Sequence, residues 1–191
     1  MKRIVVTAFA PLLLLAAGSA RLSAQQEVCK MEMNVAPMTL GEIYAKSEKI
    51  AKGWQADAVP ARLGNTSLGP IDDKGRSAAW NLMFYSKTAA ANLSISTFNG
   101  MFTCYAMPGD AGRIPDLKPT FLRDSGKLYA IAKEKGGEFL SQGFQVSIQT
   151  AAAPSDRHAT WYISYSKADG ANANRTVIVD ANTGAVEKVL D

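Results

Sequence analysis

The chain has 191 residues, with 21 Lys and Arg against 17 Asp and Glu, which gives a formal charge of +4. Three of the basic residues, Lys2, Arg3 and Arg21, lie in the first 24 positions, so the rest of the chain carries a charge of only +1. Because the sequence has no basic block or stripe, it lacks the electrostatic attraction that drives binding to nucleic-acid phosphates or to anionic membrane surfaces.

The first 24 residues are predicted to be an export signal. A short basic start is followed by an almost wholly apolar run, Ile4–Ala17, and then by small residues. The run is shorter than the roughly 20 residues that a membrane-spanning helix needs. We expect cleavage after Ala24, with Ala20 as the alternative. The mature protein is then expected to be soluble and either periplasmic or secreted.

The chain has two cysteines, Cys29 and Cys104. In an exported protein, an even pair of cysteines is more often a disulfide than a metal or catalytic site. Closing a loop of this length stabilises a fold by roughly 4 kcal/mol in the chain-entropy model. We therefore predict a disulfide between them, and two buried free thiols are the alternative.

Residues 39–106 have the pattern of one helix followed by strands. Thr39 and Glu42 fit a capping box, which predicts the start of a helix. Apolar residues then recur at helical spacing at Leu40, Ile43, Tyr44, Ile50, Ala51 and Trp54. Stretches that predict strands follow at Val59–Leu63, Trp80–Phe84, Leu93–Ile95 and Met101–Ala106, with a turn at Asn99-Gly100.

A turn-rich segment, residues 108–119, precedes a second run of elements in the same order. Asp124 or Ser125 is predicted to cap a helix, and Gly136-Gly137 is predicted to kink or interrupt it. The expected strands contain Phe144–Ile148, Trp161–Tyr165, Val177–Val179 and Ala185–Leu190. Period-two spacing places Trp80 in the first half, and Trp161 in the second, on an apolar strand face. Both are expected to anchor the core.

The repeated order predicts an α+β fold of two tandem units, each with one helix packed on a small antiparallel sheet. The predicted boundaries are 25–107 for the first unit, 108–119 for the linker and 120–191 for the second unit. A unit of about 80 residues buries only a marginal core, so the two units are expected to pack together. One undivided α+β domain is the alternative, and the sequence leaves open whether the two units share one sheet.

The second unit, from about residue 127 to 190, pairs an amphipathic helix with a Trp-containing strand, a hairpin and a closing strand of the type V-x-V-D-x-x-T-G-x-V. The residues that carry this pattern are Trp161, Ile163, Tyr165, Val177, Val179, Asp180, Thr183, Gly184 and Val186. The arrangement resembles a PepSY domain, which implies a PepSY- or cystatin-like α+β fold. The first unit looks like a divergent copy, with Trp80 in the corresponding strand and Ser96 where Asp180 would align.

The turn residues of this pattern have structural roles first. Gly184 permits a positive φ, while Asp180 and Thr183 can hydrogen-bond the local backbone. The PepSY resemblance implies an extracytoplasmic, non-enzymatic module, and a role in inhibiting or regulating peptidases has been proposed for that family. The resemblance implies no catalytic residue and no cofactor, and it does not name a partner.

The sequence contains no convincing catalytic or metal-binding set. His158 is the only histidine, which excludes His-rich zinc sites and two-histidine metalloprotease motifs, and its polar surroundings predict an exposed loop. Ser164 and Lys167 match the S-x-x-K of penicillin-recognising enzymes, but the partner motifs of those enzymes are absent. A hydrolase that uses His158 is therefore the least favoured function.

Two surfaces are candidates for binding. An exposed sheet edge would accept an extended segment of a protein partner. The space between helix and sheet, lined by Trp54, Phe84 and Tyr165 with Trp80 and Trp161, would accept a small apolar ligand if the two layers packed loosely. We predict a non-enzymatic exported binding module that regulates or inhibits a peptidase or another protein of the envelope or the medium. A periplasmic carrier of a small apolar ligand is the alternative.

Overall fold

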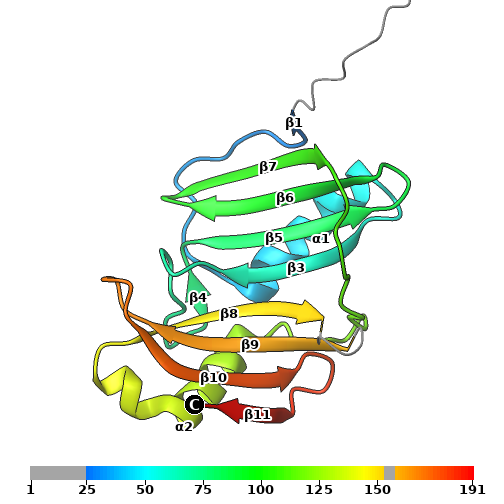
Figure 1. Cartoon of the computed structure of the whole chain (residues 1–191). Helices are drawn as coiled ribbons and strands as arrows, with labels where there is room; N and C mark the ends of the chain where they lie inside the picture. The colour runs from blue at the N-terminus through cyan, green and yellow to red at the C-terminus, as the bar shows by residue number, and fades with distance from the viewer. Residues whose placement is uncertain (1–24, 153–157) are drawn as a thin grey trace, which may run out of the picture.

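The computed structural model describes residues 25–152 and 158–191 and arranges them as a large antiparallel sheet with two helices on one face (Figure 1). The predicted α+β fold is confirmed. The predicted signal segment lies outside the described residues. Neither helix of the described chain combines the length and the apolar character that a bilayer crossing demands.

The first half contains two short strands, one helix and five further strands: β1 (Gln26–Glu27), β2 (Met38–Thr39), α1 (Leu40–Trp54), β3 (Val59–Asn65), β4 (Arg76–Ser77), β5 (Trp80–Ser86), β6 (Ala91–Phe98) and β7 (Met101–Pro108). The second half contains α2 (Ser125–Ser141), β8 (Gln145–Ala152), β9 (Ala159–Ser166), β10 (Asn172–Asp180) and β11 (Val186–Leu190). The order in the main sheet is β1-β7-β6-β5-β3-β8-β9-β10-β11, and β2 pairs separately with β4. In each half, the helix is therefore followed by four strands of the main sheet. These strands are β3, β5, β6 and β7 in the first half and β8, β9, β10 and β11 in the second.

The two halves share one sheet because β3 pairs with β8. The register joins Gly64 to Gln149. Beside this pair, a side chain replaces a backbone partner, since Ile148 N donates to Asn65 Oδ1 at 2.7 Å. The strands approach so closely that a Cβ at Gly64 would lie 2.6 Å from the carbonyl oxygen of Ile148. The sequence leaves open whether the two units share one sheet. The pairing of β3 with β8 shows that they do, and both helices pack on this continuous sheet.

Helix α1 starts with the predicted capping box. Thr39 N donates to Glu42 Oε2 at 2.7 Å, and Glu42 N donates to Thr39 Oγ1 at 3.3 Å. The bond from the Thr39 backbone, helped by the one from its hydroxyl, lowers the pKa of Glu42 because it favours the charged carboxylate. A negative charge in the first turn also interacts favourably with the helix dipole.

Helix α2 is capped by Asp124 and bent at Gly136, as the sequence predicts. Lys127 N donates to Asp124 Oδ1 at 3.0 Å. At the bend, a Cβ on Gly136 would lie 2.5 Å from Cζ of Tyr165, whose hydroxyl donates to the carbonyl oxygen of Ala132 at 2.7 Å. The helix departs from regular geometry at the point where the tyrosine ring needs room.

Ser125, the other predicted cap of α2, connects the starts of the two helices. Its hydroxyl oxygen accepts a bond from Leu40 N at 3.0 Å and donates to the carbonyl oxygen of Gly75 at 2.6 Å. Ser125 is fully buried. A buried polar side chain thus connects α2 both to α1 and to the loop before β4.

The two predicted core tryptophans make corresponding contacts. Trp80 Nε1 donates to the carbonyl oxygen of Met38 at 2.8 Å, and Trp161 Nε1 donates to that of Leu122 at 3.0 Å. Each acceptor lies just before the helix of the same half, and both indole rings are buried. In each half, a buried tryptophan therefore joins the sheet to the chain that enters the helix.

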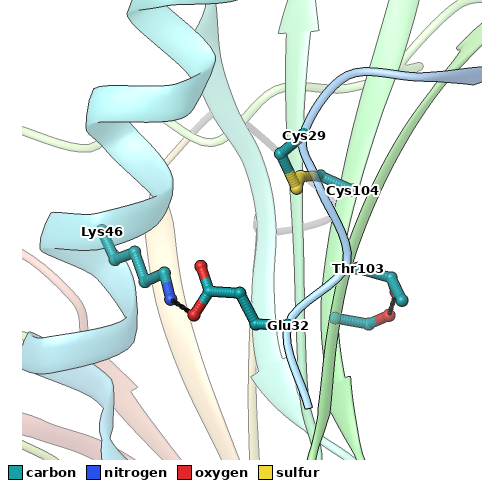
Figure 2. Close-up of a disulfide and its surroundings, with 6 residues drawn as sticks. Cys29, Glu32, Lys46, Thr103 and Cys104 are labelled. Carbon is teal, nitrogen blue, oxygen red and sulfur yellow. Dashed lines mark hydrogen bonds and ion pairs between the residues drawn. A yellow bond between two sulfur atoms is a disulfide. The ribbon is translucent and has the colours of Figure 1, made fainter. Parts of the chain in front are cut away.

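Residues 26–35, which we call the N-terminal strap, run along β7 (Figure 2). Cys29 and Cys104 form the predicted disulfide, with their Cα atoms 5.6 Å apart. Further along the strap, Glu32 N donates to the Phe102 oxygen at 3.1 Å, and Phe102 N donates to the Glu32 oxygen at 2.9 Å. The strap thus covers the outer edge of the first half.

An ion pair connects the strap to α1. Lys46 Nζ lies 2.6 Å from Glu32 Oε2, and Figure 2 shows the two side chains reaching across the gap between helix and strap. The same ammonium group lies 4.1 Å from the centre of the Phe102 ring. Helix, strap and β7 are therefore held together by covalent, ionic and cation–π contacts.

Candidate functional site at the open edge of the sheet

Strand β11 forms the outer edge of the second half and carries exposed apolar side chains. Val186, Val189 and Leu190 are each 38% exposed, and the other two residues of the strand are exposed as well. β11 pairs with β10 on its inner side, and among the described residues no strand lies on its outer side (Figure 1). The outer backbone groups of β11 can therefore receive an added strand.

The turn that leads into β11 is held by the residues of the PepSY-like pattern. Asn182 N and Thr183 N each donate to Asp180 Oδ1 at 2.7 Å. Gly184 N donates to the carbonyl oxygen of Asp180 at 2.8 Å, and Gly184 has a φ of 78°, which favours glycine. These bonds determine where β11 leaves the turn.

The same turn brings together His158, Asp180 and Glu187, which we call the His158 cluster. His158 Nε2 lies 3.2 Å from Asp180 Oδ2 and 2.8 Å from Glu187 Oε1, and the three side chains are 35%, 16% and 36% exposed. Burial raises the pKa of Asp180, but hydrogen bonds from Thr183 and Asn182 and the nearby His158 outweigh it, so the pKa is lowered. Asp180 is therefore a carboxylate at neutral pH.

The sequence predicts an exposed loop for His158 and indicates no role for Glu187, so this cluster is not among the predicted sites. In the structure, His158 is half-buried, directly precedes β9 and forms a parallel bridge with Asp116. Pairing of β9 with β10 places Thr160 opposite Asp180, and this register brings His158 to the turn. The signal for this proximity is the pairing register of the two strands.

The aromatic residues considered for a ligand pocket lie mainly in the core. Phe84 and Tyr165 are 1% and 0% exposed, and Trp54 is partly buried at the end of α1. The Phe84 ring packs against Tyr44 and the Tyr165 ring against Phe139, with centroids 6.1 and 5.6 Å apart. Burial also raises the pKa of Tyr165 to about 12. Core packing accounts for these side chains.

A shallow hollow of about 650 Å³ lies over parts of β8, β9 and β10 and is bordered by the loops that follow β3 and β9. These strands contribute uncharged polar residues to its lining: Gln145, Ser147, Gln149, Ser164, Ser166 and Asn172. They alternate with buried residues such as Val146 and Ile148, so they face away from the helices. Among the described residues, the lining includes Lys167 but no imidazole and no carboxylate, so the hollow offers hydrogen bonds without an acid–base pair.

Comparison with known proteins leaves the family of the chain open. No family model and no curated protein sequence matches it. A solved structure of a candidate lipoprotein from Clostridium difficile 630 is similar over 83% of this chain and 93% of its own, with 13% sequence identity and a TM-score of 0.48. This likeness is too weak to carry a functional argument. The PepSY resemblance therefore rests on the residues of the second half.

Proposed function

We propose that the chain is an exported, non-enzymatic binding module of two PepSY-like units that regulates or inhibits a peptidase. The disulfide supports a place in the periplasm or the medium, because disulfides persist in oxidising compartments. Two observations support related units: a helix with four sheet strands recurs, and Trp80 and Trp161 make corresponding contacts.

The observation that carries the proposal is the open edge at β11. An extended segment of a partner would add to this edge through main-chain hydrogen bonds, and Val186, Val189 and Leu190 would give it apolar contacts. The substrate clefts of peptidases bind extended peptides. The exposed backbone of β11 is extended in the same way as a bound peptide, so an extended segment of a peptidase cleft could pair with it. A peptidase is therefore a suitable partner.

Site-specific crosslinking tests the position of the partner. A photoreactive phenylalanine analogue is placed at Val189, and the protein is produced in its own organism. The expected result is a defined adduct with a peptidase of the envelope or the medium. A matched probe at Met107, an apolar residue of β7 that is 41% exposed, should not give this adduct. Equal adducts from both positions, or none from Val189, would rule out the proposed edge.

An inhibition assay then tests what binding does. Purified wild-type protein is expected to slow cleavage of a peptide substrate by the captured peptidase. The double variant Val186→Lys, Val189→Lys should bind at least about tenfold more weakly, because lysines on an edge strand oppose strand addition. Met107→Lys is the matched control and should inhibit normally. If the captured protein is not a peptidase, the binding role stands and the peptidase role is wrong.

A further inference from the structure

Three potential metal ligands converge beside the turn between β10 and β11. His158 Nε2, an oxygen of Asp180 and an oxygen of Glu187 all lie within 4.8 Å of one another. His158 lies directly before β9, Asp180 is the last residue of β10 and Glu187 is the second residue of β11. The three strands are neighbours in the sheet. Backbone pairing therefore holds all three side chains near one point.

Asp180 is positioned by the turn itself. Its Oδ1 accepts the two backbone bonds of the turn, while its Oδ2 faces His158 Nε2. Glu187 Oε1 faces the same nitrogen. One nitrogen thus lies between two carboxylate oxygens. A single N–H has to be shared between these oxygens, whereas a cation among the three atoms is bound by all of them.

We propose that His158, Asp180 and Glu187 bind a divalent transition-metal ion, with Zn²⁺ as the best match. Imidazole nitrogen and carboxylate oxygen bind zinc at roughly 2.0–2.2 Å, usually in a tetrahedron. Ligand atoms in such a tetrahedron lie about 3.4 Å apart. The nitrogen–oxygen separations here are 3.2 and 2.8 Å, and all three ligand atoms lie within 4.8 Å of one another, so side-chain rotations that bring the atoms to tetrahedral spacing would admit the ion.

The ligand set also determines which ions fit. Two carboxylates balance the charge of a divalent ion, and the imidazole favours zinc, copper or nickel. Ca²⁺ and Mg²⁺ prefer six or more oxygen ligands, which this cluster does not provide. The partial exposure of His158 and Glu187 leaves a fourth position open to water. The bound ion fastens β11 to β9 and β10, and this inference does not depend on the proposed function.

Zinc binding is measured on the untagged mature protein, because a polyhistidine tag would add metal-binding histidines. Titration against a chromophoric chelator is expected to show one Zn²⁺ per chain. His158 is the single histidine of the chain, so the imidazole resonances in a proton NMR spectrum belong to it alone. Zn²⁺ should shift these resonances, and it should raise the unfolding temperature because it binds the folded state.

Variants separate a metal site from a simple ion pair. His158→Gln and Glu187→Gln should each weaken Zn²⁺ binding by at least about tenfold, the lower range for loss of a supporting group at a metal site. The matched control is Glu134→Gln, which removes an exposed carboxylate on α2. It should bind Zn²⁺ like the wild type. Unfolding curves without metal show whether each variant folds.

Two results would overturn the proposal. One is that folded His158→Gln binds Zn²⁺ with the same affinity as the wild type. The other is a wild-type NMR spectrum in which the His158 resonances do not respond to Zn²⁺. Either result means that the cluster is an ion pair that supports the turn and not a metal site.

Discussion

The two outer edges of the sheet differ in how they are protected. The first edge, at β7, is covered by the N-terminal strap, in which Gln26 pairs with Ala106 and the disulfide fixes Cys29 to Cys104. The second edge, at β11, has no such cover within the described residues and carries exposed apolar side chains. The first edge is covered by a strap that a disulfide holds in place, and the second edge is uncovered within the described residues.

The proposed function gives this difference a reason. Proteins normally protect sheet edges, because an unpaired strand is a template for aggregation. The strap provides this protection at β7. In β11, Glu187 and Lys188 lie between the apolar residues Val186 and Val189, and their charges oppose uncontrolled pairing without covering the backbone. The second edge is therefore the one that the proposed partner would use, and variants of each half can test this comparison.

Removing the disulfide is expected to have the largest effect, because it is the covalent part of the strap. The double variant Cys29→Ser, Cys104→Ser should lower the free energy of unfolding by up to about 4 kcal/mol, since the bond closes a loop with a sequence separation of 75. Urea unfolding followed by tryptophan fluorescence measures the change. Dithiothreitol should reduce the stability of the wild type to that of the variant and leave the variant unchanged. A variant as stable as the oxidised wild type would show that noncovalent contacts suffice to hold the strap.

The two helices differ in how they meet the corresponding aromatic residue of the sheet. That residue is Phe84 in the first half and Tyr165 in the second, where α2 bends at Gly136. Gly136→Ala should lower the free energy of unfolding by about 1–3 kcal/mol through overpacking. The added methyl group would meet a ring that is buried and hydrogen-bonded to Ala132, and such a ring cannot simply move away.

The neighbouring glycine is the matched control for this variant. A Cβ at Gly137 meets no atom within 4 Å. Gly137→Ala should therefore raise the free energy of unfolding by about 0.5–1 kcal/mol, because alanine favours helix more than glycine does. Thermal and urea unfolding of the two variants give the sign of each effect. Equal effects would mean that Tyr165 does not cause the bend.

Local signals predict most of the elements, because each signal depends on residues close in the chain. The capping box at Thr39 and the bend at Gly136 are examples. Local signals do not predict that the two halves share a sheet, because the contact between β3 and β8 joins distant residues. Leu63 N donates to Thr150 Oγ1 at 2.8 Å, across a sequence separation of 87. The strap also escapes prediction, since the two residues of β1 are too few to show a period.

Some features of the candidate site also follow from local sequence, whereas others depend on long-range pairing. The roles of Asp180 and Gly184 in the turn follow from local hydrogen bonding and backbone geometry. The meeting of His158 with Glu187 depends on the register of three strands, which includes an irregularity in β10 after Ile178. No local pattern encodes that register. The exposure of β11 likewise depends on which strand ends the sheet, and that is a property of the whole topology.

The link between the helix and the next strand also differs between the halves. The second link contains Gly143, with a φ of 84°. The first link contains Asp57, whose carboxylate accepts bonds from Ser86 Oγ at 2.6 Å and from Thr88 N at 2.9 Å. These bonds, above all the one from Ser86, lower the pKa of Asp57 to about 2. A small pH-dependent contribution to stability is therefore expected in the first half.

The charged form of Asp57 stabilises the fold fully above its ordinary pKa of 3.8, and the contribution is lost as the pH falls toward 2. Asp57→Asn should therefore be less stable than the wild type at neutral pH, and the difference should disappear in acid. Urea midpoints measured across this range test the expectation. Ser86→Ala keeps the carboxylate of Asp57 but removes its main hydrogen-bond donor. The pH dependence of its stability should therefore lie between those of the wild type and Asp57→Asn. A constant difference between Asp57→Asn and the wild type at every pH would show that the stabilisation does not come from the carboxylate charge.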